Sequence, residues 1–141
     1  MKNIDIIKKI VENFDIDEEI FKNFEFEIIK DVIWIHSKKI RDLEVSHSNR
    51  KGLRFGNILK DKSIRISFFT GQLFGRFAKK RVVELNEEEL VLFMRGLDIE
   101  NRWNYNEGQV IVRFSNISLG TATITGNILK PQVPTAKRLK V

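Results

Sequence analysis

Few side chains in this sequence have the types and spacing that chemistry requires. His36 and His47 are the only histidines, and no acidic residue accompanies them at a metal-ligand spacing. The run Gly71–Arg76 has two glycines but lacks the spacing of a phosphate-binding loop. No serine lies in a nucleophile motif, and the absence of cysteine excludes thiol nucleophiles, thiolate metal sites and disulfides. The sequence therefore predicts no metal ion and no cofactor.

Three successive carboxylates, Glu87–Glu89, could act as acid–base groups, but the start of a helix explains them better. Asn86 precedes the run, and Glu89 stands three residues after it, which is the spacing of a capping box. Gly96 is then expected to end the helix. The buried side of this helix is predicted to carry Leu90, Phe93 and Met94.

The distribution of charge is a stronger functional signal. The chain of 141 residues has 25 basic and 19 acidic residues, a net charge of +6. Residues 48–81 hold ten basic residues and one acid, and residues 130–141 hold four basic residues and no acid. If the fold brings the tail beside the middle segment, these two blocks form one surface for the phosphates of RNA or DNA. The alternative is a solvated surface with a frayed basic tail.

Aromatic side chains could add base stacking to such a surface. Trp103 and Tyr105 lie in the polar segment 101–108, where they could stack on an unpaired base or pack over the end of a barrel, and we favour packing. Trp34 lies in an apolar strand run and is expected in the core. Residues 79–81 lead directly into a predicted strand, so part of this basic run must project to solvent, where it can contact phosphates.

The N-terminal part carries helix and hairpin patterns. Asp15 or Asp17 can cap a short helix over residues 18–21, and residues 24–28 and 32–36 predict a β-hairpin. A first helix is predicted by apolar residues three and four apart: Ile4, Ile7, Ile10, Val11 and Phe14.

The middle of the chain predicts a change of structure. Gly71 and Gly75 are expected to weaken or end the short helix over residues 68–74. The features expected in order are a helical turn over residues 38–43, a connection at 49–52, apolar residues at 53, 55 and 58 that lead to a polar turn at 61–62, an alternating run over 64–66, and a short helix over 68–74.

The last third is typical of β structure. Pro131 and Pro134 cannot donate to a sheet, so the tail is expected to be extended and at an edge. Short strands separated by glycine turns favour a small sandwich or barrel. These strands are predicted over residues 81–85, 109–114, 121–125 and 128–130.

The N-terminus has charged residues every two or three positions, so it has neither the apolar core of a signal peptide nor a membrane-spanning run. The expectation is a soluble, cytoplasmic protein.

Several short segments follow one another in a recognisable order: Asp15–Phe21, Val32–Ile35, Gly52–Gly56, Ala78–Glu89 and Phe93–Gly96. Their order resembles the C-terminal RNA-binding extension of the Nop/Sun family of RNA cytosine methyltransferases. Later segments resemble the PUA-type module that ends this extension, and also look similar to the Nip-type ribosome-biogenesis factors. They are Gly108–Val112, Ile117–Gly120, Gly126–Lys130 and Lys137–Leu139.

The resemblance implies an α+β protein in which an N-terminal α/β pre-PUA lobe, residues 1–75, precedes a PUA-like β pseudo-barrel, residues 76–141. It also implies structured RNA, rRNA or tRNA, as the partner and no chemistry in this segment. The family's catalytic domain, glycine-rich cofactor motif and catalytic cysteines are missing here, so S-adenosylmethionine should not bind. The insertion Pro131–Ala136 departs from the family's pattern before the terminal basic residues.

These observations predict a non-catalytic RNA-binding protein in RNA modification or ribosome biogenesis. The resemblance implies a groove for RNA beside a Leu-Gly turn, and basic residues would contact phosphates. The predicted RNA-binding residues are Arg50, Lys51, Arg54, Arg76, Lys79, Lys80, Arg81, Leu119, Gly120, Lys130, Lys137 and Arg138. The alternative is a protein-interaction subunit that docks in trans onto an RNA methyltransferase or an assembly factor, and a small enzyme is the least favoured reading.

Overall fold

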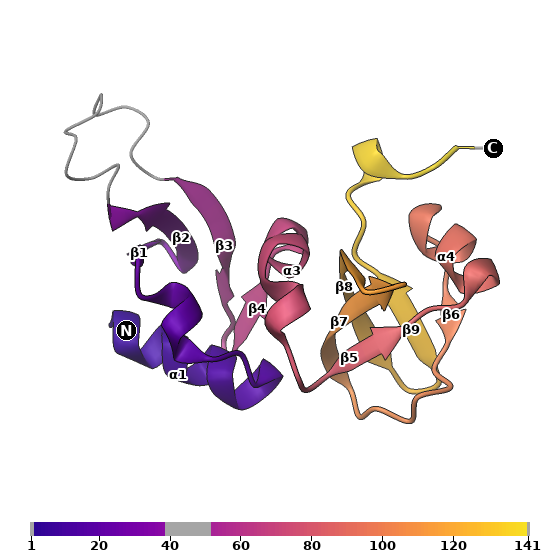
Figure 1. Cartoon of the computed structure of the whole chain (residues 1–141), viewed down its shortest axis with the longest axis horizontal. Coiled ribbons are helices and arrows are strands. Elements are labelled where there is room, and N and C mark those ends of the chain that lie inside the picture. The colour runs from indigo at the N-terminus through magenta and orange to yellow at the C-terminus, as the bar shows by residue number, and fades with distance from the viewer. Residues whose placement is uncertain (1, 39–51, 141) are drawn as a thin grey trace. The chain divides into compact units, whose positions relative to one another are not determined.

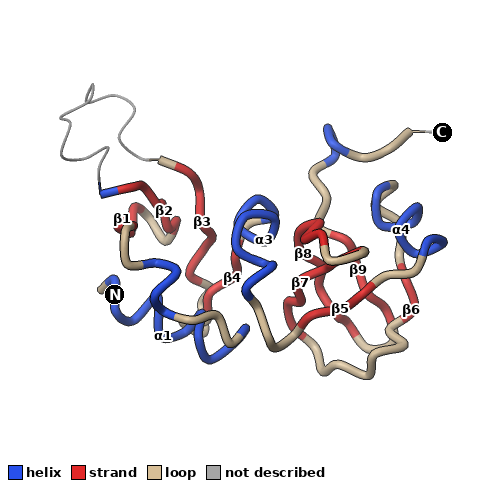
Figure 2. The backbone as a smooth tube through the Cα atoms, in the orientation of Figure 1, coloured by secondary structure: helices blue, strands red, loops and turns tan. Residues whose placement is uncertain are grey.

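The structure, a computed structural model, describes residues 2–38 and 52–140, and the chain divides into two compact units, residues 1–67 and 68–141 (Figure 1). Each unit combines helices with one β-sheet (Figure 2), which confirms the α+β class. The boundary predicted from the sequence lies between residues 75 and 76. Helix α3 (Phe68–Phe74) instead groups with the second unit, because it packs on a strand of that unit.

The first unit is an antiparallel sheet with helices before it in the chain. Its strands pair in the order β1-β2-β3-β4. Lys30 and Asp31 join β1 to β2 with φ values of 49° and 65°, the backbone region of a two-residue hairpin turn, so the predicted hairpin is confirmed. The elements are α1 (Asn3–Phe14), η1 (Glu18–Phe21), β1 (Phe24–Ile29), β2 (Val32–Ser37), β3 (Leu53–Ile58) and β4 (Ile64–Ile66).

Helix α1 buries part of the predicted stripe, Ile10 and Phe14, together with Ile6, which was not predicted. Ile6, Ile10 and Phe14 are buried, because a spacing of four residues places them on one side of the helix. Ile4 stands two residues before Ile6, on the opposite side, and is 67% exposed. The prediction of a helix is confirmed, whereas the assignment of Ile4 to its apolar stripe is wrong.

An aromatic cluster fills the core of the first unit. Phe26 packs edge-on against Phe55 with ring centroids 5.0 Å apart, and Phe21 lies 6.0 Å from Phe26. The short helix η1 brings Phe21 there, and its start is capped by Asp17, whose carboxylate accepts a hydrogen bond from the backbone N–H of Glu19 at 3.0 Å.

Trp34 does not lie in this core. Its neighbours Ile33 and Ile35 are buried on one face of β2, so the alternation of a strand places Trp34 on the other face, where it is half-buried. The predicted helical turn at 38–43 and the connection at 49–52 fall almost wholly outside the described residues.

The second unit is a curled five-stranded sheet with the order β5-β7-β8-β9-β6. Strand β5 runs parallel to β7, and the other pairs are antiparallel. The elements after α3 are η3 (Gly75–Phe77), β5 (Val82–Glu84), α4 (Glu87–Met94), β6 (Ile99–Glu100), β7 (Gly108–Phe114), β8 (Ile117–Thr125), β9 (Ile128–Pro131) and η4 (Thr135–Lys137).

Strand β8 is longer than predicted. It begins at Ile117, so Leu119 and Gly120 lie inside a strand rather than in a turn. The register places Gly120 opposite Val112 and Ser118 opposite Arg113, which makes Leu119 the extra residue of a β-bulge. The prediction of a Leu-Gly turn is therefore wrong.

The tail follows the expectation of an extended edge only in part. Strand β9 runs between β8 and β6, but β6 pairs only with Ile128 and Leu129, so among the described residues Pro131, which pairs with Ala122 of β8, is unpaired on its other side as expected. Pro134 then leads into the short helix η4 rather than into extended chain.

The core of this unit lies between helix α4 and one face of the sheet. Phe93, in the last turn of α4, is fully buried against apolar residues of β5 and β7–β9. Asn86 and Glu89 form the predicted capping box, and Gly96, with φ +74°, follows the helix end. Met94 is 36% exposed, so its predicted place in the buried stripe is wrong.

Helix α3 lies close to strand β8 because it carries glycine at the contact. A Cβ atom on Gly71 would stand 2.6 Å from Cγ2 of Thr121 and 2.9 Å from the carbonyl carbon of Gly120. Arg113 of β7 fixes the next turn, because its guanidinium donates to the carbonyls of Gly75 and Ala78. Gly71 and Gly75 are thus contact residues, and the helix continues into η3.

Candidate nucleic-acid interface

The predicted RNA-binding residues fall in both units. Arg50 and Lys51 lie outside the described residues. Arg54 lies on β3 of the first unit, exposed, and its guanidinium donates to Oδ1 of Asn57 at 2.8 Å. The other nine belong to the second unit: Arg76, Lys79, Lys80, Arg81, Leu119, Gly120, Lys130, Lys137 and Arg138.

Three exposed cations of the second unit follow helix α3 in the chain. Arg76 lies in η3, with its guanidinium carbon 4.6 Å from the ring centroid of Phe77. Lys79 and Lys80 come next, in the turn before β5, and both are exposed. These side chains have the charge and the accessibility that phosphate contacts require.

Arg81 has a different role from its two neighbours. Its Nε donates to the carbonyl of Gln109 at 3.0 Å, and its Nη2 donates to the carbonyl of Asn106 at 2.8 Å. The guanidinium carbon also lies 5.2 Å from the ring centroid of Tyr105. Partial burial lowers the pKa of Arg81 from its ordinary value. Arg81 therefore fastens the loop before β7.

Leu119 and Gly120 face the interior of the second unit. Leu119 is half-buried against the core cluster. Gly120 is buried, and a Cβ atom there would lie 2.5 Å from Cδ1 of Phe68. Helix α3 of this same chain thus covers Gly120 on that side.

The terminal basic residues are placed by β9 and by the tail after it. Lys130 is exposed between the buried Leu129 and Pro131, as strand alternation requires. The ammonium of Lys137 lies 5.6 Å from the ring centroid of Phe69, so the basic tail comes beside helix α3. This contact brings part of the basic tail, residues 130–141, beside part of the basic block 48–81.

Arg138 helps to hold the tail on the domain. Its Nε donates to the carbonyl of Val133 at 3.1 Å, and its side chain lies against Gly96. The N–H of Leu139 donates to the carbonyl of Met94 at 2.7 Å, which satisfies one of the free carbonyls at the end of α4.

The aromatic pair of the 101–108 segment packs on the domain, as favoured from the sequence. Trp103 and Tyr105 are half-buried against the core cluster. The hydroxyl of Tyr105 donates to the carbonyl of Val82 at 2.9 Å. Both rings are thus partly covered by the domain, and the guanidinium carbon of Arg102 lies 4.3 Å from the ring centroid of Trp103.

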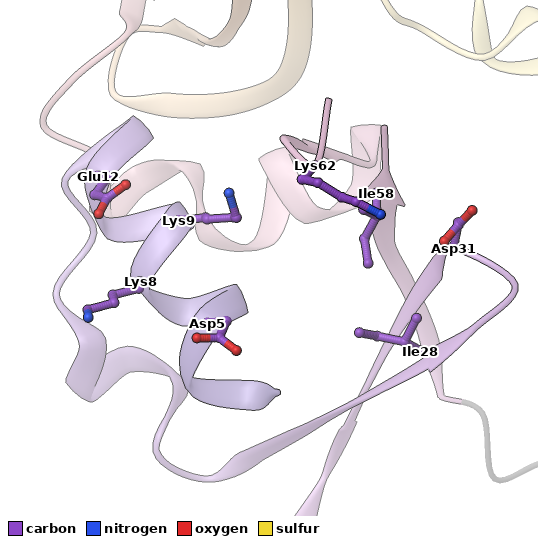
Figure 3. Close-up of a pocket in the computed structure, with 8 residues that line it drawn as sticks. All are labelled: Asp5, Lys8, Lys9, Glu12, Ile28, Asp31, Ile58 and Lys62. Atoms are coloured by element: carbon purple, nitrogen blue, oxygen red, sulfur yellow. The ribbon is translucent and has the colours of Figure 1, made fainter. Parts of the chain in front are cut away.

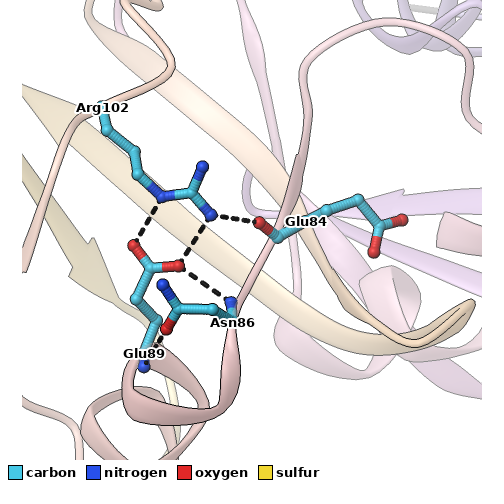
Figure 4. A network of polar contacts seen from close by, with 4 residues as sticks. All are labelled: Glu84, Asn86, Glu89 and Arg102. Carbon is cyan, nitrogen blue, oxygen red and sulfur yellow. Dashed lines mark hydrogen bonds and ion pairs between the residues drawn. The ribbon is translucent and has the colours of Figure 1, made fainter.

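A network of hydrogen bonds lies at the N-terminal end of α4 (Figure 4). Arg102 donates from Nε to Oε2 of Glu89 at 2.9 Å and from Nη2 to Oε1 at 2.8 Å. The same Nη2 donates to the backbone carbonyl of Glu84 at 2.9 Å. The hydrogen bond from Arg102 lowers the pKa of Glu89, and the backbone N–H of Asn86 acts in the same direction. Glu89 in turn raises the pKa of Arg102. These carboxylate contacts are structural.

Arg102 and Arg113 organise the second unit but were not predicted from the sequence as functional residues. Both stand in the block 82–129, which has only three basic residues against seven acids. An isolated arginine in an acidic, apolar-rich segment is a signal for an internal partner, because a guanidinium can satisfy several carbonyl or carboxylate oxygens at once.

The first unit has a cavity of about 570 Å³ beside helix α1 (Figure 3). Three acids and three lysines line it together with two isoleucines, so its charges balance and it does not favour an anion. The lining residues are Asp5, Lys8, Lys9, Glu12, Ile28, Asp31, Ile58 and Lys62. Within residues 2–38 and 52–140, no group of three potential ligands could hold a metal ion, and no helix could span a membrane.

Comparison with known families finds one match, at the C-terminal end of the chain. Residues 80–139 match the family described as the PUA domain of methyltransferase RsmF. No curated protein matches the chain. The matched residues contain every strand of the second sheet, together with α4 and η4. Residues 80–139 therefore form a PUA-like β-barrel domain, similar to the PUA domain of methyltransferase RsmF and consistent with the C-terminal extension of Nop/Sun methyltransferases.

Proposed function

We propose that this protein is a non-catalytic RNA-binding protein that recognises structured rRNA or tRNA in the cytoplasm. It would act in RNA modification or ribosome biogenesis. The observation that carries the proposal is the PUA domain at residues 80–139. The exposed cations of the second unit supply the electrostatic attraction that such binding needs.

The structure separates the predicted contact residues by what their side chains do. Arg76, Lys79, Lys80, Lys130 and Lys137 are exposed and carry the phosphate contacts in this proposal. Arg81 and Arg138 each donate to backbone carbonyls, so their first contribution is to position the loop and tail that carry the others.

The test is RNA binding by the full chain over a range of salt concentrations. We expect a transcribed tRNA and a ribosomal RNA hairpin to bind with an affinity that falls steeply as salt rises. The double variant Lys79→Glu and Lys80→Glu should weaken both RNAs alike, because phosphate contacts carry no sequence information.

A matched control is the double variant Lys22→Glu and Lys30→Glu. It makes the same change of net charge with exposed lysines of the first unit. Equal losses in the two double variants would mean that net charge alone drives binding. Salt-insensitive binding, or full affinity after reversal of Lys79 and Lys80, would refute the proposal.

One observation favours the second candidate, a subunit that docks in trans onto an RNA methyltransferase or assembly factor. Helix α4 and the tail expose large apolar side chains: Val91 (49%), Met94 (36%), Leu97 (41%) and Leu139 (53%). The backbone bond from Leu139 to Met94 holds two of them together. A protein partner retained after nuclease treatment, and lost in Val91→Asp, would support docking over direct RNA binding.

A further inference from the structure

One exposed face of the second unit combines aromatic and apolar side chains with cations. Phe69 and Leu73 stand four residues apart on α3, one turn along the same side of the helix, and are 45% and 53% exposed. Phe77 follows in η3 and is half-buried. An exposed phenylalanine on a short helix is a feature that the core of this unit does not require.

Each of the two outer rings has a cation over it. The Lys137 ammonium lies 5.6 Å from the centroid of Phe69, and the Arg76 guanidinium carbon lies 4.6 Å from the centroid of Phe77. We call this surface, formed by Phe69, Leu73, Arg76, Phe77 and Lys137, the α3 face.

The surroundings of the α3 face are basic in sequence as well. Residues 68–81 and residues 130–141 contain no acidic residue. Lys79 and Lys80 continue the first of these segments directly after η3. A ligand of the α3 face would therefore need negative charge together with a flat or apolar group.

We propose that the α3 face binds an unpaired nucleotide of the RNA, with its base stacked on Phe69 and a neighbouring phosphate on Lys137. Proteins that bind single-stranded RNA combine these two elements, an aromatic platform and a basic track along the backbone. Lys137 is exposed, so its flexible side chain can turn from the ring to a phosphate as the base enters. The inference rests on the proposed function and assigns the base contact within it.

The geometry also explains why this role goes to Phe69 and not to the loop aromatics. Trp103 and Tyr105 pack against the core, and the Tyr105 hydroxyl is bonded to Val82. Phe68, beside Phe69 in sequence, turns to the core and stacks on Phe93 with ring centroids 6.4 Å apart. Phe68 thus anchors the start of α3 and contacts Phe69 edge-on, with ring centroids 5.9 Å apart, while Phe69 stays 45% exposed.

The test uses the full chain and a short single-stranded RNA that carries one 2-aminopurine, with the same sequence as a blunt duplex for comparison. Stacking on Phe69 should quench the 2-aminopurine fluorescence. Phe69→Leu should weaken binding of the single strand about tenfold and relieve the quenching, whereas binding of the duplex changes little. Phe69→Tyr should bind like the original protein, because it keeps an aromatic face.

Salt titration separates stacking from charge. Phe69→Leu removes no charge, so its dependence of affinity on salt should match that of the original protein. Lys137→Gln should reduce that dependence by about one phosphate contact. Ile117→Ala is the matched control, because Ile117 is a 63% exposed apolar side chain of the same unit.

The outcomes distinguish this inference from the proposed function. If the original protein binds neither RNA, both fail. If it binds the duplex but Phe69→Leu, folded by circular dichroism, binds and quenches the single strand like the original protein, only the base contact is refuted. If Phe69→Leu instead loses a nuclease-resistant protein partner and keeps its RNA affinity, the α3 face is a protein-docking surface and the inference is wrong.

Discussion

Arg102 holds the carboxylate of Glu89 with two parallel hydrogen bonds of 2.9 and 2.8 Å. The Glu89 side chain is only 10% exposed, whereas that of Arg102 is 47% exposed. Glu89 also accepts from the backbone N–H of Asn86 at 2.9 Å, so a single carboxylate joins the start of α4 to the segment after β6. A buried carboxylate of this kind depends on its donors, because water reaches it poorly.

Replacement of Arg102 by alanine should therefore destabilise the second unit by about 2 kcal/mol, since it leaves Glu89 with fewer donors. Arg102→Lys should cost less, because an ammonium keeps the charge but cannot make the parallel pair. Hydrogen exchange of the β7 amides reports on this unit separately. Lys80→Ala is the control, because Lys80 is exposed. Equal protection of the β7 amides from exchange in Arg102→Ala and Lys80→Ala would contradict the prediction.

The same pair predicts a dependence of stability on pH. The folded pKa of Glu89 is lowered from its ordinary value of 4.5. The ionised carboxylate thus contributes its full stabilisation above about pH 4.5 and loses it as the pH falls through the lowered folded value. The difference in unfolding free energy between the original protein and Glu89→Gln should narrow as the pH falls below about 4.5.

A urea titration at several pH values measures this difference. Glu87→Gln controls for the loss of one negative charge from the first turn of the same helix, where Glu87 is exposed. A constant difference between the original protein and Glu89→Gln across the acidic range would show that the carboxylate charge is not what stabilises the contact.

Local patterns predicted much of the fold. The capping box at Asn86 and Glu89, the hairpin turn at Lys30 and Asp31, and the order of the C-terminal strands each follow from residues close in sequence. Such signals depend on backbone chemistry that acts over a few residues, and tertiary contacts did not override them here.

Features that depend on contacts between distant residues could not be predicted in this way. The sequence predicts Gly120 in a turn. The bulge in β8, and the packing of the Phe68 ring over Gly120, depend on residues far apart in the chain. Arg81 reads as part of a basic run with Lys79 and Lys80, and only the fold shows that its donors go to carbonyls of the loop before β7. The charge pattern alone thus could not separate the exposed Lys79 and Lys80 from Arg81, which is engaged within the fold.

The contact of α3 with β8 predicts an unusual response to Gly71→Ala. In an isolated helix alanine is more favourable than glycine by about 1 kcal/mol. Here the added Cβ would lie 2.9 Å from the backbone carbon of Gly120, so we expect a net loss of about 1–2 kcal/mol. The exposed Gln72→Ala on the same helix should be neutral or slightly stabilising. Thermal unfolding of both variants measures the difference, and a stabilised Gly71→Ala would mean that α3 can move away from β8.

Variants of Arg81 and Lys79 distinguish a residue that stabilises the domain from one that contacts RNA. Arg81→Gln removes a guanidinium that donates to the carbonyls of Gln109 and Asn106, so the second unit should lose about 1–2 kcal/mol of stability. The salt dependence of its RNA affinity should stay near that of the original protein, because Arg81 is partly buried and already engaged. Lys79→Gln should do the reverse, leaving stability unchanged and reducing the salt dependence by about one contact. Urea unfolding measures the stability of both variants, and RNA titrations at several salt concentrations measure their salt dependence. If Arg81→Gln shows a reduced salt dependence and unchanged stability, Arg81 contacts phosphate and the prediction is wrong.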